Sequence, residues 1–223
     1  MLKNYLKTSL RNLWKDKSST FLNLAGMALG ITSCMLILIF IKDELNFNKS
    51  NVQMDRIYQV DWNSKASGQL SESATTPVVL GSLITPETPQ IKAEVRLYPR
   101  SGEMQYQNGK NSHELKRFEE QNIYFSDNSI FQVFTIPFIK GDSHSALLNI
   151  NSVVITSSTA KKYFGTEDPI GKVLLYENKT PLQVTGLIDD RPSNSDLQFD
   201  FLISFETLFS VESLPVGNFI KTD

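Results

Sequence analysis

The 223-residue sequence predicts an α+β domain, a mixture of short strands and helices, anchored by one transmembrane helix near the N-terminus. Three observations lead to this fold class. An uncharged apolar run lies close to the N-terminus, basic residues gather just before it, and short alternating runs broken by turns fill the rest of the chain. The net charge of −2 conceals this division, because the part after the apolar run is acidic.

The apolar run covers residues 21–41 and contains no charged side chain. As a helix, a run of this length extends about 31 Å, which matches a hydrocarbon core of about 30 Å. A buried core helix is one alternative, but such helices are rarely apolar on every face over this length. A cleaved signal peptide is another, with an apolar region of about 7–15 residues that ends in small residues. The run is longer and continues directly into a polar stretch, KDELNF, so the sequence favours a retained transmembrane helix.

Basic residues before this run indicate its orientation. They are Lys3, Lys7, Arg11, Lys15 and Lys17. By the positive-inside rule, the N-terminus lies in the cytoplasm and residues 42–223 lie outside the cytoplasmic membrane. Four of the five recur every four residues beside a stripe of leucines, which predicts an amphipathic helix over residues 1–20. We expect it to lie in the cytoplasmic membrane interface, with its cations near anionic lipid. The KSS stretch, residues 17–19, would form the elbow, with Ser18 or Ser19 capping the spanning helix. An ordinary solvated amphipathic helix is the alternative.

Gly26 and Gly30 form a G-x-x-x-G pair within the predicted span. Small residues four positions apart allow a second helix to approach closely. The pair therefore predicts a helix-packing site, although glycine is common in membrane helices and the spacing alone is equally compatible with a lipid-facing position.

Short alternating runs from residue 57 onward predict the α+β domain. We expect strands over residues 57–62, 91–98, 103–107, 122–126, 152–156 and 197–204. We expect helices over residues 129–136 and 157–164, a turn over 137–142, and a hairpin over 171–189 that turns at Asn178–Lys179.

The stretch FGTEDPIGKVL, residues 164–174, superficially resembles a phosphate-binding loop. Five residues separate Gly165 from Gly171, one more than such a loop has, and Val173 stands where a hydroxyl should hold magnesium. Pro169 also removes a backbone amide. A helix precedes this stretch and a strand follows it, the reverse of the usual order. The sequence therefore predicts a helix C-terminus at Gly165 and no nucleotide site.

Residue patterns for catalysis, metal binding or cofactor binding are not found in the sequence. His113 and His144 have no neighbouring cysteine or histidine cluster, and Cys34 is a single cysteine within the apolar run. The paired acids Glu119–Glu120 and Asp189–Asp190 are expected to be solvated turn residues. The sequence has no basic patch with interleaved aromatic residues, the pattern that would indicate a nucleic-acid partner. We therefore expect neither an enzyme nor a nucleic-acid-binding protein.

Several segments together resemble the MacB/FtsX-type ABC transporter permeases. LKTSLRNLWKDKSSTFLNLAGMALGI, residues 6–31, is similar to their first helix. The MacB-like periplasmic core domain is similar to residues 130–147 (IFQVFTIPFIKGDSHSAL), 153–174 (VVITSSTAKKYFGTEDPIGKVL) and 182–204 (LQVTGLIDDRPSNSDLQFDFLIS). These segments occur in the family order and cover essentially the whole chain.

The resemblance implies a permease subunit in a bacterial cytoplasmic membrane rather than an ATPase. It also implies a separate cytoplasmic ATPase partner, a second permease subunit in a dimer, and a role in transport such as efflux. Family permeases carry further transmembrane helices after the outer domain, so we expect this chain to be the N-terminal portion of a longer permease. The alternative is a complete single-pass membrane protein with a sensing or scaffold domain outside. An anchored extracytoplasmic hydrolase is disfavoured because no nucleophile constellation is present.

Overall fold

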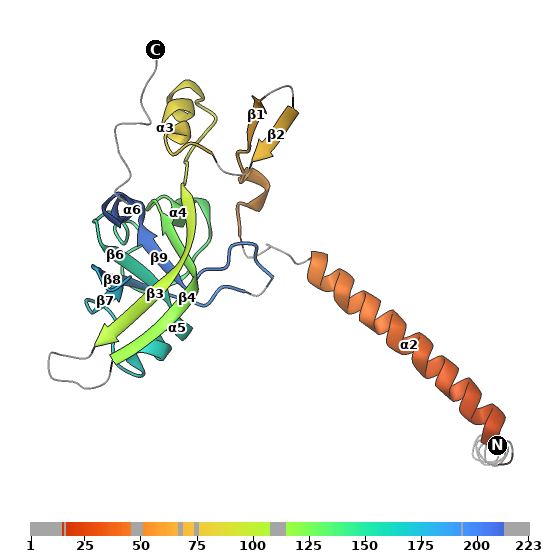
Figure 1. The fold of residues 1–223 in the computed structure, drawn as a ribbon. Coiled ribbons are helices and arrows are strands. Elements are labelled where there is room, and N and C mark those ends of the chain that lie inside the picture. The colour runs from red at the N-terminus through yellow and green to blue at the C-terminus, as the bar shows by residue number, and fades with distance from the viewer. Residues whose placement is uncertain are drawn as a thin grey trace. The chain divides into compact units, whose positions relative to one another are not determined.

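A computed structural model describes residues 15, 17–45, 51–66, 69–73, 76–107, 115–192 and 194–211 (Figure 1). The chain divides into two compact units, Met1–Phe47 and Asn48–Asp223. In the first unit, helix α2 extends over Lys17–Leu45. It therefore begins before and ends after the predicted span. Ser18 and Ser19 lie inside this helix, so the elbow expected there is wrong.

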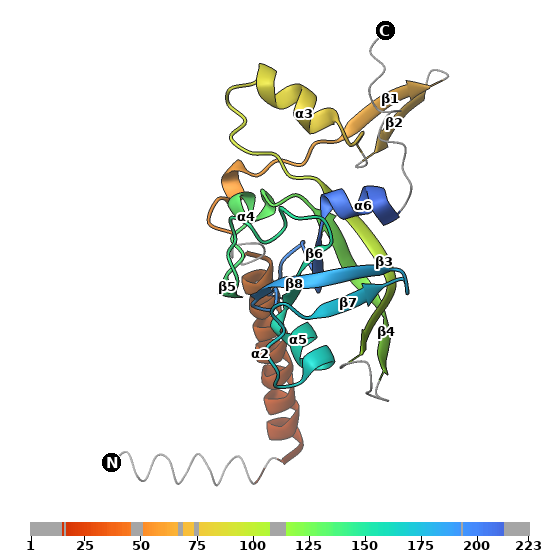
Figure 2. The same ribbon diagram turned by 90° about the vertical axis from the view of Figure 1, so that its left-hand side faces the viewer.

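The second unit is built around a ring of strands. These are β3 (Leu97–Gln107), β4 (Leu115–Ser126), β6 (Ser152–Thr156), β7 (Val173–Tyr176), β8 (Thr180–Ile188) and β9 (Phe201–Ser204). The order β8-β6-β9-β4-β3-β7 closes because β7 also pairs with β8, and the short edge strand β5 (Phe138–Lys140) adds to the end of β8. Figure 2 shows β7 and β8 side by side, with the long β3–β4 hairpin next to them. We call this ring the barrel.

Strands β6 and β9 are buried on both faces, which explains their nearly continuous apolar sequences, SVVIT and FLIS. Since side chains alternate along a strand, Val153 and Ile155 enter one hydrophobic cluster, while Val154 enters the other. The first cluster contains Phe125, Phe201 and most other large buried side chains. The second lies beneath α4 (Ile130–Val133) and the loop that follows β5.

Helix α5 (Ser157–Phe164) has sequence-encoded signals at both ends. The hydroxyl of Thr156 accepts a hydrogen bond from the Thr159 amide at the N-terminus. Gly165 ends the helix with φ 66°, a conformation that favours glycine. The remaining elements are α6 (Phe205–Val211), α3 (Leu80–Ile84), η1 (Met54–Arg56), η2 (Thr85–Glu87) and the hairpin of β1 (Trp62–Ala66) and β2 (Gln69–Ser73).

Most of the elements predicted from residue 103 onward are confirmed. They are the strands over 103–107, 122–126 and 152–156, the helices near 129–136 and over 157–164, and the hairpin over 171–189. The strand predicted over 197–204 is confirmed only from residue 201 onward. The hairpin turns through Glu177 and Asn178, both with positive φ, one residue earlier than expected.

Three predictions fail, two of them before residue 99 and one near β5. Within residues 57–62 only Trp62 belongs to a strand. Tyr58 and Val60 alternate with polar residues as a strand would, but both side chains are exposed and do not belong to the buried core of the domain. Within residues 91–98 only the last two belong to a strand. The turn expected over 137–142 contains edge strand β5, whose short length hides its pairing in the sequence. The β1–β2 hairpin and α6 were not predicted.

Candidate functional site

Helix α2 has the properties of a membrane-spanning element. Apolar residues surround it on every side, and Leu22 and Ile39 are 73% and 65% exposed. Thr32 and Ser33 donate their hydroxyls to carbonyl oxygens four residues earlier, at 2.7 and 2.9 Å. These hydroxyls are therefore satisfied within the helix, as a hydrocarbon environment requires. Among the described residues, this is the one helix long and apolar enough to cross a membrane.

Gly26 and Gly30 lie one turn apart and share a face of α2. A Cβ atom added at either position would meet nothing within 4 Å. This face is therefore open to a second helix, and packing there stays a prediction.

The basic residues that set the predicted orientation are only partly described. Lys15 and Lys17 are helical and exposed at the N-terminal end of the spanning helix. Lys3, Lys7 and Arg11 lie outside the described residues, as does most of the amphipathic helix expected over 1–20.

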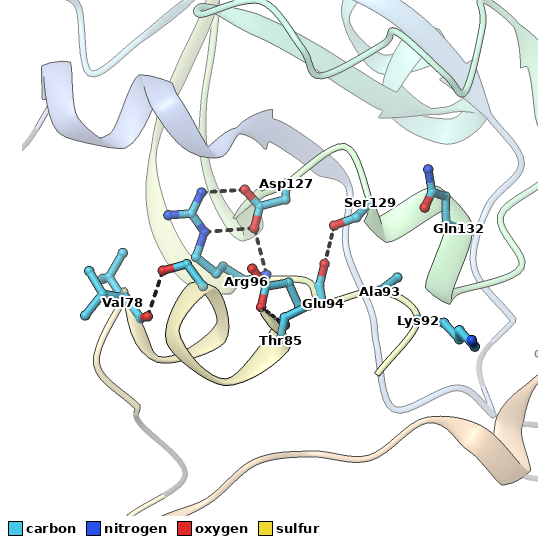
Figure 3. Close-up of a pocket in the computed structure, with 11 residues that line it drawn as sticks. Val78, Thr85, Lys92, Ala93, Glu94, Arg96, Asp127, Ser129 and Gln132 are labelled. Carbon is cyan, nitrogen blue, oxygen red and sulfur yellow. Dashed lines mark hydrogen bonds and ion pairs between the residues drawn. The ribbon is translucent and has the colours of Figure 1, made fainter. Parts of the chain in front are cut away.

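A pocket of about 430 Å³ lies where the α3–η2 segment meets the adjoining ends of β3 and β4 (Figure 3). The strand register explains its central ion pair. Because Leu97 pairs with Ser126 in the antiparallel β3–β4 hairpin, the residues just beyond them, Arg96 and Asp127, come to lie opposite one another.

Arg96 forms a two-pronged contact with Asp127. Its Nη2 lies 2.6 Å from Oδ1, its Nε donates to Oδ2 at 2.8 Å, and its backbone amide also donates to Oδ2. The guanidinium carbon lies 3.9 Å from the ring centre of Phe205. Burial alone would lower the pKa of Arg96, but hydrogen bonding and attraction to Asp127, with help from Glu206 and Glu94, raise it. The guanidinium therefore stays charged at every working pH.

Glu94 joins the α3–η2 segment to this wall of the pocket. Its carboxylate accepts a hydrogen bond from Thr85 Oγ1 at 2.6 Å, and its backbone oxygen accepts one from the Ser129 hydroxyl. A side chain at Gly81 would meet the Glu94 carboxylate, which would have to shift. Ser82, the third hydroxyl of the pocket, donates to the Val79 carbonyl oxygen.

The hydroxyls and charged groups just described bond to protein groups. Their arrangement stabilises a seam between the α3–η2 segment and the barrel. The sequence analysis did not identify this ion pair. The sequence holds no clear signal for it, because Arg96 is one of three charged residues that alternate with apolar ones over 91–98.

The helix–turn–strand order predicted around residues 164–174 is confirmed. Lys172, the lysine of the apparent phosphate loop, pairs with Glu167 and lies 5.1 Å from the ring centre of Phe164. Its amide donates to the Pro169 carbonyl oxygen, which closes the turn before β7. Both the side chain and the backbone amide of Lys172 therefore form contacts within the turn between α5 and β7.

The first acid pair differs from the prediction, because Glu119 and Glu120 both lie in strand β4 rather than in a turn. Glu120 is 7% exposed rather than solvated, because β4 directs it under α5. There its Oε1 lies 2.7 Å from Lys162 Nζ and accepts a hydrogen bond from the Tyr163 hydroxyl at 2.5 Å. Glu119, its neighbour, points to the other face and is exposed, as alternation requires. Glu120 therefore joins β4 to α5 through Lys162 and Tyr163.

The second acid pair lies just after β8. Asp190 is exposed, as expected, and accepts hydrogen bonds from the Ser158 amide and the Ser157 hydroxyl at the start of α5. Although its slight burial would raise the pKa of Asp190, these hydrogen bonds lower it below its ordinary value.

The described residues contain no group of three or more His, Cys, Asp or Glu side chains placed to hold a metal ion. His144 and Cys34 are exposed, the first in the loop after β5 and the second on α2. His113 lies outside the described residues.

Together these features define a mixed α/β domain preceded by one helix that is long and apolar enough to cross a membrane. The model of the MacB-like periplasmic core domain matches residues 20–220, so the chain belongs to this family of ABC-type permeases. A search of curated proteins finds no match.

Several solved structures are similar to parts of the chain. The periplasmic region of MacB from Actinobacillus actinomycetemcomitans has 18% identity and a TM-score of 0.49, over 76% of this chain and 67% of that one. A domain assigned to a permease protein from Porphyromonas gingivalis has 24% identity and a TM-score of 0.43, over 58% of this chain and 55% of that one. The extracellular domain of the noncanonic ABC-type transporter YknZ from Gram-positive bacteria has 17% identity and a TM-score of 0.40, over 54% and 58%. The chain thus spans between about half and two thirds of these relatives.

Proposed function

We propose that the chain serves as a permease-type subunit of an ABC transporter, in which α2 transmits the movement of a separate cytoplasmic ATPase to the outer domain. One observation carries this proposal. A helix without a buried apolar face is joined, within a few residues, to a domain of the MacB-like periplasmic core family. The lipid-suited helix and the family assignment together favour a transport subunit. ATP hydrolysis would belong to the partner.

The proposal includes a topology. The basic residues before α2 favour a cytoplasmic N-terminus in the bacterial cytoplasmic membrane, with residues 42–223 outside. Alkaline phosphatase fused at Asn51 or Phe219 should be active, and a cytoplasmic fluorescent protein fused at the same positions should be dark. The reverse pattern would overturn the topology and the function together.

The proposal also includes partners, namely an ATPase, a second permease subunit and lipid. The test is to tag the chain in the cells that produce it, extract it in mild detergent, and identify the proteins that co-purify by mass spectrometry. We expect an ABC ATPase whose ATP hydrolysis rate changes when the chain is present. Recovery of the chain without an ATPase, at native expression, would favour the single-pass sensing or scaffold protein instead.

A further inference from the structure

The segment that follows the membrane helix contacts the domain through one buried residue. Asn51 is 7% exposed, whereas Val52 and Tyr58 in the same segment are 86% and 82% exposed. All other residues from 53 to 61 are exposed as well, except Ile57, which is half-buried. A polar side chain is thus buried at the start of an otherwise solvent-exposed segment, which requires hydrogen-bond partners.

Thr135, just after α4, supplies these partners. The Thr135 amide donates to Asn51 Oδ1 at 3.1 Å, and Val52, the next residue, donates its amide to Thr135 Oγ1 at 3.1 Å. The two bonds run in opposite directions between the same pair of segments. They therefore fix both the position and the direction of the chain at Asn51.

Arg191 connects this contact to the end of β8. Its Nη1 donates to the Thr135 carbonyl oxygen at 3.1 Å, and its Nη2 donates to the buried Ser195 hydroxyl at 3.2 Å. Burial lowers the pKa of Arg191. Nearby, the Asp189 amide donates to the Pro137 carbonyl oxygen, so the segments after α4 and after β8 are joined twice. We call Asn51, Val52, Thr135 and Arg191 the Asn51 clasp.

We propose that the Asn51 clasp is the point at which displacement of the membrane helix is delivered to the barrel. This inference rests on the proposed function. Helix α2 ends at Leu45, and six peptide units can extend over no more than about 22 Å. Displacement of the helix beyond the slack in this short connection must therefore load Asn51 and, through Thr135 and Arg191, the ends of α4 and β8.

Among the side chains that the structure describes, the alternative apolar attachment is much farther along the chain. After Asn51, the next described side chain that packs against the barrel core is Val78. A connection from Leu45 to Val78 could extend to roughly 120 Å, which would absorb any movement of a few ångströms. Transmission of a small displacement therefore requires the clasp to stay closed.

Hydrogen exchange tests the clasp in the assembled transporter, reconstituted in nanodiscs with its ATPase. The variants are Asn51→Ala and Thr135→Val, and Gln53→Ala is the matched control because Gln53 is exposed in the same segment and caps nothing. Asn51→Ala removes the acceptor of the Thr135 amide, so that amide should exchange at least about tenfold faster, while amides of β6 should not change. Thr135→Val should do the same to the Val52 amide.

The decisive measurement compares amide exchange in residues 186–191 with and without ATP. We expect an ATP-dependent change in the unaltered chain and in Gln53→Ala, and its loss in both clasp variants, with the ATPase still bound. The inference would be overturned if a clasp variant kept the full ATP-dependent change in residues 186–191 while its Thr135 or Val52 amide exchanged faster. Unchanged slow exchange of that amide in the variant would overturn it as well. Absence of any ATP-dependent change in the unaltered, ATPase-bound chain would instead count against the proposed function.

Discussion

The membrane helix and the barrel use the same apolar residue types in opposite ways. In α2, Leu22 and Ile39 are exposed, and the backbone hydrogen bonds join residues of the same helix. In the barrel, Ile155 and Phe201 are fully buried, and strands such as β6 and β9 depend on partners far along the chain. The first region has the surface that a lipid environment suits, and the second depends on packing. The two regions should therefore respond separately to substitution.

The largest effect is expected in the barrel core. Phe201→Ala should lower the free energy of unfolding of the domain by about 3–5 kcal/mol, since a fully buried ring contacting Tyr163 is lost. Ile39→Ala, an apolar truncation on α2, should leave it unchanged. Urea unfolding in detergent, followed by fluorescence and circular dichroism, measures both. Similar losses in the two variants would contradict the independence of the two regions.

On α2, substitution should affect assembly instead. Gly26→Leu or Gly30→Leu should weaken association with another helix by roughly 1–3 kcal/mol, because a side chain is inserted into a close contact. Membrane insertion should survive, since leucine is at least as apolar as glycine. Co-purification with the ATPase and membrane fractionation measure these separately. If both variants assemble as well as the control Ala28→Leu, the glycines face lipid.

Burial in the barrel also predicts a pH dependence. Burial, together with the hydrogen bond to Glu120 and its charge, raises the pKa of Tyr163 well above its ordinary value. Above about pH 10 only the unfolded chain loses this proton. The contribution of Tyr163 to stability should therefore be constant below that pH and fall by about 1.4 kcal/mol per unit above it. Tyr163→Phe should remove this part of the slope. Equal slopes in the two proteins between pH 10 and 11 would refute the assignment.

The pocket seam should give a smaller effect. Arg96→Lys keeps the charge but loses the two-pronged contact with Asp127, and should cost about 1 kcal/mol of unfolding free energy. Arg117→Lys is the matched control, because its single contact with Glu103 is half-exposed and should be worth less. Denaturant unfolding compares them. A larger loss in Arg117→Lys would show that the seam contributes little.

The same contrast explains what could be predicted from the sequence. Helix α2, α5 and the β7–β8 hairpin depend on contacts within a few residues, and their signals, such as Thr156 and Gly165, stand beside them. Residues 57–62 alternate like a strand, but whether a partner strand exists is a non-local fact, and here none pairs with Tyr58 or Val60 among the described strands.

The same limit applies to the candidate sites. Arg96 and Asp127 are 31 positions apart in the sequence, and only the β3–β4 register brings them together. Asn51 and Thr135 are still farther apart, and no local pattern links them. Gly26 and Gly30 are the opposite case, since helical spacing alone places them on one face. Sequence reasoning therefore finds sites within one element and misses those between elements.

The smallest effect is expected at Lys172, the lysine of the apparent phosphate loop. Its ammonium pairs with a half-exposed Glu167 and lies near the Phe164 ring, so Lys172→Ala should cost only about 0.5 kcal/mol. The turn should persist, because Gly165 and Gly171 keep their positive φ and the Lys172 backbone amide is retained. ATP titration of the purified chain, before and after the substitution, should show no saturable binding in either case. Saturable ATP binding that Lys172→Ala abolished would overturn the assignment of this stretch as a helix-to-strand turn without a nucleotide site.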